Sequence, residues 1–180
     1  MFDFANSQCY NQKKTRGGRA MPKVYSFIAW SGTGKTTYLE ALIAALKARG
    51  ARVAAVKHDA HRLSLDREGK DSWRFAAAGA EMVAVADGEK WALMEYRPRS
   101  LEEILAQMHD VDIILVEGWH TEARNPILLH RAALGQPPKL PPDACFAVVT
   151  DAPLDSGGRP SFPLDAPEAL AEFLLAQTEE

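Results

Sequence analysis

The sequence predicts an α/β fold in which helices cover both faces of a mostly parallel β-sheet, giving three layers. Short apolar runs of strand length alternate with longer segments whose apolar residues recur at helical spacing. The chain has 180 residues, of which 47% are hydrophobic and 25% charged, as is ordinary for one globular core. We expect a single domain over residues 21–180 and a disordered N-terminal extension over residues 1–20, which are polar and aperiodic.

Composition argues against two classes of partner. A nucleic-acid-binding domain usually carries a basic surface, and a membrane span needs roughly 18 consecutive apolar residues. The net charge is −3 and the apolar runs are short, so we expect no nucleic-acid and no membrane partner. Cys9 and Cys145 are isolated, which is typical of neither a disulfide framework nor a zinc site. We expect a cytoplasmic protein.

The first predicted strand, residues 24–28, ends in a segment with the spacing of a phosphate-binding loop, or P-loop. This segment is Ala29-Trp-Ser-Gly-Thr-Gly-Lys-Thr36, and a helical pattern follows it up to Gly50. The backbone N–H groups at a helix start bind phosphate because they have no partner within the helix. The sequence therefore predicts a P-loop NTPase fold with a nucleoside triphosphate site.

The residue types of this loop suit phosphate and Mg²⁺. Lys35 would neutralise the β- and γ-phosphates, and Thr36 would give its hydroxyl to Mg²⁺. Ala29 replaces the usual first glycine of the motif but is small enough to preserve the loop. The residues that we expect to contact nucleotide in this segment are Ser31, Gly32, Thr33, Gly34, Lys35, Thr36 and Thr37.

The next elements continue the alternation and then depart from it. Residues 52–56 form the second predicted strand, and a short helix follows up to about residue 78. Residues 81–86 and 91–96 flank the turn sequence Asp87-Gly-Glu-Lys90, which is typical of a β-hairpin. We expect this hairpin to form an antiparallel pair at the edge of the sheet.

The second half of the chain returns to strand and helix signals. A capping box, Ser100-Leu-Glu-Glu103, predicts a helix start. A buried strand over residues 111–116 follows, and short strands at 127–130 and 146–149 flank a proline-rich loop. The final helix starts after Asp165, which we expect to cap it.

The carboxyl ends of parallel strands meet at one edge of a sheet, so residues that follow the other strands should lie near the P-loop. Glu117 ends an apolar strand, as the acidic residue of the second nucleotide-binding motif does, and would hold Mg²⁺ or its water. Gly118 would offer its N–H to the γ-phosphate. Asp59 would contact Mg²⁺, phosphate or water, and it is the first candidate to orient an attacking water.

Three further segments have two interpretations each. In Gly69-Lys-Asp-Ser-Trp73, Lys70 and Asp71 would bind an anion, or Asp71 or Ser72 would simply cap the helix that follows. Asp151 would either accept from the N1–H and N2–H₂ groups of guanine or belong to an ordinary turn, and base identity stays open on chemistry alone. His58 and His61 have a spacing that metal ligands use, but no third ligand accompanies them. Three tryptophans in or beside these motifs would either stack on a ligand ring or, as we expect, pack in the core; they are Trp30, Trp73 and Trp119.

Taken together, the motifs resemble the MobB family, molybdopterin-guanine dinucleotide biosynthesis protein B. Besides the P-loop, the segments that carry the resemblance are Val56-Lys-His-Asp-Ala-His61, Gly69-Lys-Asp-Ser-Trp-Arg74 with Ala78-Gly-Ala80, and Leu115-Val-Glu-Gly-Trp119. The P-loop alone is widespread, but the four motifs in this order are specific to the family. The resemblance runs from about Val24 to Asp151 and into the C-terminal helix.

The resemblance implies a GTP-binding accessory protein that uses Mg²⁺, hydrolyses GTP slowly and forms a homodimer. It implies a role in molybdenum cofactor biosynthesis, assisting the MobA-like guanylyltransferase that joins GMP to molybdopterin. Molybdopterin or molybdopterin-guanine dinucleotide would be further ligands. Carried onto this sequence, Lys35, Asp59 and Glu117 would be catalytic, and Thr36 would join Asp59 and Glu117 around the metal. Lys70 and Asp71 would face ligand in a second segment.

Two departures from the family pattern remove fixed positive charges. His120 stands where the family usually has a lysine, and Asn125-Pro-Ile127 replaces a Pro-Lys-Ile pattern. A histidine titrates near neutral pH, so any phosphate contact at residue 120 would depend on pH.

Other functions of a P-loop protein stay open. A small-molecule kinase would release nucleoside diphosphate only with an acceptor, and a non-catalytic carrier would bind nucleotide and molybdopterin without meaningful hydrolysis. A metal-delivery GTPase would need stoichiometric metal at His58 and His61.

Overall fold

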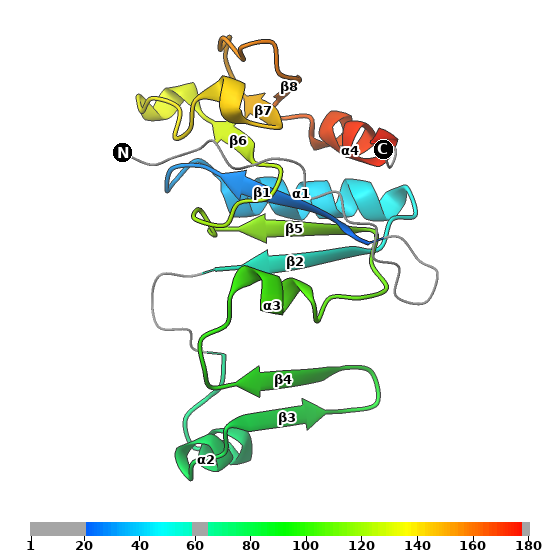
Figure 1. Cartoon of the computed structure of the whole chain (residues 1–180), viewed down its shortest axis with the longest axis vertical. Helices are drawn as coiled ribbons and strands as arrows, with labels where there is room; N and C mark the ends of the chain where they lie inside the picture. Colours follow the sequence, from blue (N-terminus) through cyan, green and yellow to red (C-terminus); the bar gives the residue numbers. More distant parts are fainter. Residues whose placement is uncertain (1–20, 59–64, 178–180) are drawn as a thin grey trace. The chain divides into compact units, whose positions relative to one another are not determined.

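The computed structural model describes residues 21–58 and 65–177 and divides the chain into two compact units (Figure 1). The first unit consists of the described residues of Met1–His58 and Met108–Glu180, and the second of those of Asp59–Gln107. The extension predicted over residues 1–20 and the residues Asp59 and His61 lie outside the described part. Within that part, no helix is long and apolar enough to cross a membrane.

The first unit is built on a six-stranded sheet whose neighbouring strands are all parallel, in the order β2-β5-β1-β6-β7-β8. The strands are β1 (Lys23–Ile28), β2 (Val53–Lys57), β5 (Ile113–Glu117), β6 (Ile127–His130), β7 (Ala147–Thr150) and β8 (Ser161–Pro163). The predicted α/β class and mostly parallel sheet are confirmed. The three-residue strand β8 has no apolar run of its own, and the sequence does not predict it.

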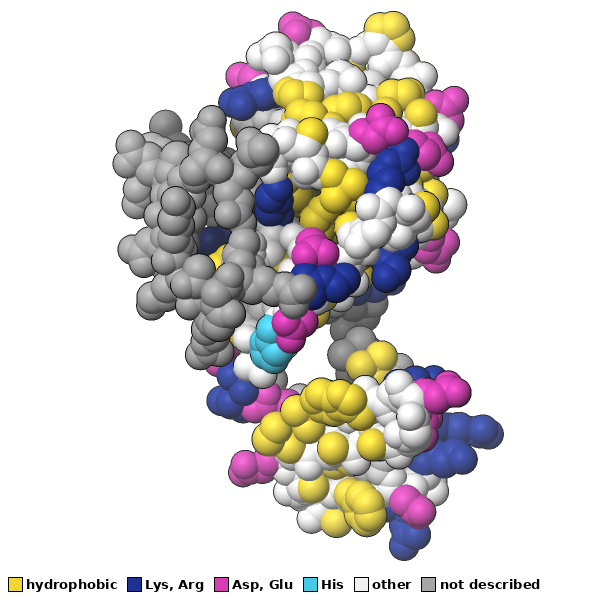
Figure 2. Space-filling view, turned by 90° about the vertical axis from the view of Figure 1, so that its right-hand side faces the viewer, with side chains coloured by type: hydrophobic (Ala, Val, Ile, Leu, Met, Phe, Trp, Pro, Cys, Tyr) yellow, Lys and Arg dark blue, Asp and Glu magenta, His cyan; other side chains and the backbone are white. Residues whose placement is uncertain are grey.

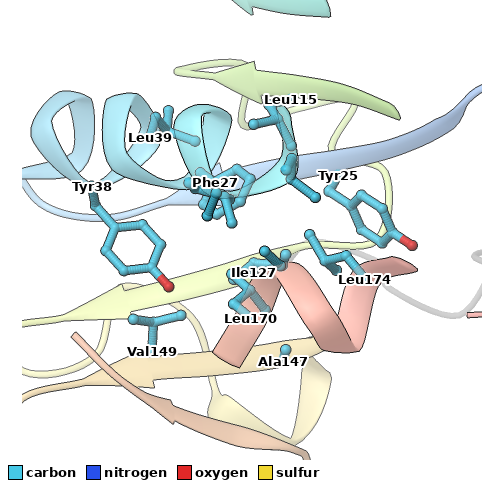
Figure 3. Close-up of a cluster of buried hydrophobic side chains, with 14 of the residues drawn as sticks. Tyr25, Phe27, Tyr38, Leu39, Leu115, Ile127, Ala147, Val149, Leu170 and Leu174 are labelled. Atoms are coloured by element: carbon cyan, nitrogen blue, oxygen red, sulfur yellow. The ribbon is translucent and has the colours of Figure 1, made fainter. Parts of the chain in front are cut away.

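The main core lies between this sheet and two helices, α1 (Lys35–Ala48) and α4 (Pro167–Ala176). Figure 3 shows side chains of both helices meeting those of the strands in one cluster, with Leu39 from α1 and Leu170 from α4. A smaller cluster contains Leu128 and Val148, which alternate with the residues of the main cluster along their strands. Of the three layers that we expect, the described residues of this unit therefore show the sheet and the helical layer on one face.

Helix α1 ends as the sequence predicts, whereas α4 begins differently. Gly50 has φ +83°, and the N–H groups of Gly50 and Ala51 donate to the carbonyls of Lys47 and Leu46, which is a Schellman motif. The predicted capping of α4 by Asp165 is wrong, because Ala166 is the N-cap and no side-chain hydrogen bond from a described residue caps the helix. Pro167 at the first turn lacks an N–H and needs no cap there.

The second unit contains a hairpin and two short helices. Strands β3 (Met82–Ala86) and β4 (Trp91–Glu95) form the predicted antiparallel pair, and the helices are α2 (Asp71–Ala77) and α3 (Leu101–Leu105). The predicted position of this hairpin at the edge of the main sheet is wrong, because β3 and β4 form a separate two-stranded sheet. Their backbone groups pair with each other, and α2 packs against β3 within the same unit.

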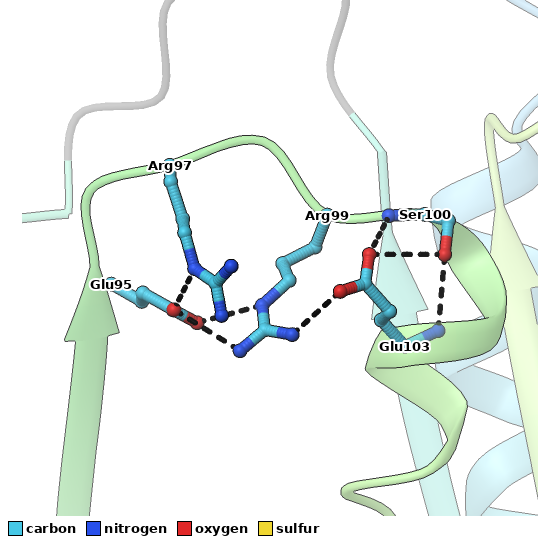
Figure 4. A network of polar contacts seen from close by, with 5 residues as sticks. All are labelled: Glu95, Arg97, Arg99, Ser100 and Glu103. Carbon is cyan, nitrogen blue, oxygen red and sulfur yellow. Dashed lines mark hydrogen bonds and ion pairs between the residues drawn. The ribbon is translucent and has the colours of Figure 1, made fainter.

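A polar network fixes the start of α3 (Figure 4). The Ser100 hydroxyl accepts from the Glu103 N–H at 3.2 Å, and the Glu103 carboxylate accepts from the Ser100 N–H at 2.9 Å, which confirms the predicted capping box. Arg99 bridges Glu103 to Glu95 at the end of β4. The network therefore ties the hairpin to the helix that follows it.

Hydrophobic side chains gather on the surface of the second unit (Figure 2). In the register of the hairpin, Trp91, Leu93 and Met82 alternate with residues of the other face, so they share one face of the two-stranded sheet. Their exposed fractions are 71%, 48% and 51%. By contrast, Val83 on the opposite face is buried. Val85 on that same face is 48% exposed, so burial there is incomplete, whereas Trp91, Leu93 and Met82 are all exposed.

Candidate functional site

The segment between β1 and α1 has the backbone geometry of a phosphate-binding loop. Gly32 and Gly34 have φ of +80° and +88°, a left-handed conformation that other residues rarely adopt. Thr33 is buried, and its hydroxyl donates to the Trp30 carbonyl at 2.8 Å, closing a tight turn. Gly34 is the N-cap of α1, so the loop leads directly into the helix. The predicted strand, loop and helix are confirmed, and their nucleotide contacts stay predictions.

The start of α1 suits an anion. Among the described residues, no side chain caps this helix, and its first turn contains no acidic residue. Lys35 lies at the first helical position, and the side chains of Ser31, Thr36 and Thr37 are exposed to solvent. The N–H groups and the helix dipole both favour negative charge at such a helix start.

Glu117 contacts this helix start from the carboxyl end of β5. Its carboxylate accepts from the Thr36 hydroxyl at 3.1 Å and lies 3.8 Å from the Lys35 ammonium. The side chains of Lys35 and Glu117 are only 15% and 14% exposed, which strengthens their attraction. The structure thus brings together two of the three predicted Mg²⁺ ligands, Thr36 and Glu117, whereas Asp59 lies outside the described residues. A hydroxyl and a carboxylate are hard oxygen ligands, and Mg²⁺ usually takes one or two of these plus phosphate oxygens and water.

Gly118 lies where the ends of β2 and β5 approach each other closely. It has φ +86°, and a Cβ atom at this position would overlap the His58 carbonyl oxygen. The His58 N–H donates to the Glu117 carbonyl at 2.8 Å, and the His58 and Trp119 rings lie 4.5 Å apart. Only glycine fits between these strand ends, and the predicted contact of its N–H with the γ-phosphate stays a prediction.

Asp151 lies at the same edge of the sheet, directly after β7. One carboxylate oxygen accepts from the Ala132 N–H at 2.8 Å, and the other lies 3.9 Å from the Arg131 guanidinium. Arg131 Nε in turn donates to the Thr33 carbonyl of the P-loop at 2.9 Å. The sequence contains no motif that marks Arg131, because its partner is a backbone atom far away in the chain. Base recognition by Asp151 stays a prediction.

The P-loop tryptophan also contacts the proline-rich loop between β6 and β7, which contains the short 3₁₀ helices η1 (Ala132–Leu134) and η2 (Pro142–Ala144). Trp30 Nε1 donates to the Pro137 carbonyl at 2.8 Å, and the Lys139 ammonium lies 4.8 Å from the Trp30 ring centre. Trp30 and Trp73 are 39% and 38% exposed, so the expectation of core packing is wrong for both. The sequence does not single out Lys139 either.

The environment of His120 is positively charged. Partial burial is the main cause that lowers the pKa of His120 below its usual value. The positive charges of Lys139 and Lys35 lower it further, as does His58. His120 therefore stays mostly neutral at pH 7 and does not replace the fixed charge of a lysine at this position.

The remaining predicted residues lie elsewhere or outside the described part. Lys70 and Asp71 belong to the second unit, where Lys70 is the N-cap of α2 without a side-chain capping bond from a described residue. The capping interpretation is therefore wrong for both Asp71 and Ser72, because each lies inside the helix. Asp71 instead lies 3.6 Å from Arg74, and its ligand role stays a prediction. Across residues 21–58 and 65–177, no cluster of three or more histidine, cysteine or acidic side chains could hold a metal ion.

Comparisons with known proteins agree on one family. The model of the family described as molybdopterin guanine dinucleotide synthesis protein B matches residues 24–151. A molybdopterin-guanine dinucleotide biosynthesis adapter protein of Haemophilus influenzae is 43% identical over 70% of this chain and 73% of its own length. The protein of the same name from Escherichia coli is 42% identical over 77% of this chain and 83% of its own length.

Solved structures show the same relationship. A crystal structure of molybdopterin-guanine biosynthesis protein B is 28% identical, covers 85% of this chain and 97% of its own, and has a TM-score of 0.65. A MobB protein homolog from Bacillus stearothermophilus is 26% identical, with coverages of 84% and 94% and a TM-score of 0.60. The match to the family model spans both the P-loop and the strand ends that carry Glu117 and Asp151. This chain therefore belongs to the MobB family.

Proposed function

We propose that this protein is a cytoplasmic GTP-binding accessory protein of molybdenum cofactor biosynthesis. It assists the conversion of molybdopterin to molybdopterin-guanine dinucleotide. The observation that carries the proposal is the meeting of Lys35, Thr36 and Glu117 at the start of α1. The family model and the names of the similar proteins, which describe molybdopterin-guanine dinucleotide biosynthesis, support the pathway.

In this proposal the P-loop holds the GTP phosphates and Mg²⁺. The loop N–H groups and the Lys35 ammonium neutralise phosphate charge, while Thr36 and Glu117 hold Mg²⁺ or its water. Bound Mg²⁺ would supply further charge neutralisation. Because Glu117 is engaged with Thr36 and Lys35, it suits metal binding better than activation of water. The protein would hydrolyse GTP slowly, and Asp59 is the residue proposed to orient the attacking water.

We further propose that the protein forms a homodimer and acts on a MobA-like guanylyltransferase. The adapter names of its relatives support interaction with other enzymes of the pathway. The exposed apolar face of the hairpin, with Trp91, Leu93 and Met82, supports association with a second copy. An isolated two-stranded hairpin is marginally stable, and burial of this face against the same face of a partner would stabilise it.

Thermal unfolding with nucleotide tests GTP binding. With Mg²⁺ and GTP or GDP at about 100 times Kd, we expect a stabilisation of about 2.7 kcal/mol. In a domain of this size, that corresponds to a rise in Tm of about 5–10 °C. Lys35→Ala should abolish the rise, because it removes the charge beside the phosphates. Lys47→Ala is the matched control, since Lys47 is exposed in the last turn of the same helix.

The nucleotide preference decides between the candidate functions. Stabilisation by GTP and GDP but not by ATP supports a guanine-nucleotide protein, whereas equal or larger stabilisation by ATP favours a small-molecule kinase. Phosphate release from GTP without an acceptor supports the slow GTPase, and binding without release supports a carrier. No stabilisation by any nucleotide would contradict the proposal.

A further inference from the structure

Arg131 connects the strand edge to the P-loop and belongs to none of the sequence motifs. It is the first residue after β6, and its Nε donates to the Thr33 carbonyl at 2.9 Å. Its Nη2 lies 3.3 Å from the place where a Cβ atom would stand on Gly34. The guanidinium therefore lies directly against the peptide group that joins Thr33 and Gly34.

This peptide group is one that the phosphate site depends on. In a planar trans peptide, the C=O and the following N–H point in opposite directions. A bond that holds the Thr33 carbonyl therefore also fixes the direction of the Gly34 N–H, which is among the groups expected to bind phosphate. Glycine has a wide choice of backbone conformations, so without such a bond this peptide could rotate more freely.

The second anchor of Arg131 is Asp151 at the end of β7. The carboxylate lies 3.9 Å from Nη1 of Arg131 and accepts the N–H of the next residue, Ala132, at 2.8 Å. Asp151 therefore contacts both the guanidinium of Arg131 and the backbone of the next residue. The arginine is 40% exposed and the aspartate 29%, so the pair is partly shielded from water.

We propose that Arg131 is a positioning residue for nucleotide binding, which holds the Thr33–Gly34 peptide in the conformation that binds phosphate. The inference rests on the proposed function, because it assumes that the P-loop binds nucleotide. It goes beyond that function in assigning a role to a side chain outside the P-loop. Asp151 supports the same role by holding the guanidinium in place.

Titration with Mg²⁺ and GDP tests this role in Arg131→Met, which keeps an unbranched side chain but loses the donor and the charge. We expect the affinity to fall about tenfold, as for loss of one hydrogen bond from a charged donor. The matched control is Arg159→Met in the same unit. Arg159 Nε also donates to a backbone carbonyl, that of Asp143 at 2.8 Å, outside the P-loop. The control should bind GDP like the wild type.

A salt series separates positioning from general attraction. A direct bond is hardly screened, so the affinity ratio of wild type to Arg131→Met should be similar at about 0.05 M and about 0.5 M salt. A ratio that falls towards one at high salt, an unchanged affinity, or an Arg131→Met chain that is unfolded without nucleotide would each overturn the role. Failure of the wild type to bind GDP would overturn both this inference and the proposed function, whereas equal GDP affinity of the wild type and Arg131→Met would overturn the inference alone.

Discussion

Glu117 carries two contacts that a nucleotide and its metal would have to rearrange. Its carboxylate accepts from Thr36 and attracts Lys35, and all three side chains come from two elements that are far apart in sequence. Because β1 and β5 are neighbouring parallel strands, their carboxyl ends place the P-loop and Glu117 side by side. Strand pairing therefore places Glu117 beside the P-loop. The sequence alone marks it as a candidate, because it is an acidic residue at the end of an apolar strand.

Tyr38 is a residue whose buried hydroxyl costs stability. It belongs to α1 and lies in the main core (Figure 3). Within the described part of the chain its hydroxyl is buried and has no hydrogen-bond partner. Burial, and secondarily the charge of Glu168, raises the pKa of this hydroxyl, which stays neutral at pH 7. Its substitution by phenylalanine therefore removes one unpaired polar group and little else.

We expect Tyr38→Phe to raise the free energy of unfolding by about 1 kcal/mol, because a buried hydroxyl without a partner is destabilising. Urea unfolding at pH 7 measures this change. Tyr96→Phe is the control, since Tyr96 is half-exposed in the second unit and should change little. A lower stability of Tyr38→Phe would mean that the hydroxyl makes a stabilising contact.

For helices and strands, the features that depend on neighbouring residues are predicted from the sequence better than those that depend on contacts between distant segments. The capping box at Ser100 and the C-terminal glycine of α1 are confirmed, because both depend on residues within one turn. The hairpin itself is confirmed for the same reason, but its place in the molecule is not, since nothing within residues 81–96 indicates which strand lies beside it. Arg131 shows the same limit, because it contacts a carbonyl from another element.

The capping box of α3 predicts a dependence of stability on pH. Hydrogen bonds from the Ser100 N–H and Arg99 lower the pKa of Glu103 to about 2. The folded pKa is below the unfolded value, so the carboxylate stabilises the fold above about pH 4.5. This contribution is lost as the pH falls towards about 2.

Glu103→Gln should therefore be less stable than the wild type at about pH 6, and the two stabilities should converge as the pH falls to about 2. The difference in the free energy of unfolding is measured by urea unfolding, with amide hydrogen exchange in residues 100–105 as the local probe. Ser100→Ala gives the contrast, because loss of the cap costs about 1 kcal/mol even where Glu103 is protonated. A constant gap between Glu103→Gln and wild type across this range would rule out the ionised carboxylate as the cause.

The whole molecule combines a well-buried sheet unit with a hairpin unit that leaves apolar side chains exposed. The first unit has a continuous core between the sheet, α1 and α4. In the second, α2 has no buried residue, and Trp91, Leu93 and Met82 are exposed on one face of the hairpin. An exposed apolar face adds little to the stability of a single chain, whereas a symmetric dimer would bury this face of both chains.

Leu93→Asp should shift the proposed homodimer to monomer, because it places a charge in the centre of the apolar face. Size-exclusion chromatography with light scattering measures the mass over a dilution series. Leu175→Asp is the matched control, since it introduces the same charge at an exposed leucine of α4 in the other unit. A monomeric wild type, or a dimer that persists in Leu93→Asp, would contradict this interface.

The central position of β1 has a consequence for synthesis on the ribosome. This strand is the first of the sheet to be made, yet its two neighbours are β5 and β6, which are made about 90 and about 100 residues later. A nascent chain that ends before Ile113 therefore has a P-loop sequence but no strand to hold it. In the proposed function, nucleotide would therefore bind only once β5 and β6 have been made, after most of the chain has left the ribosome.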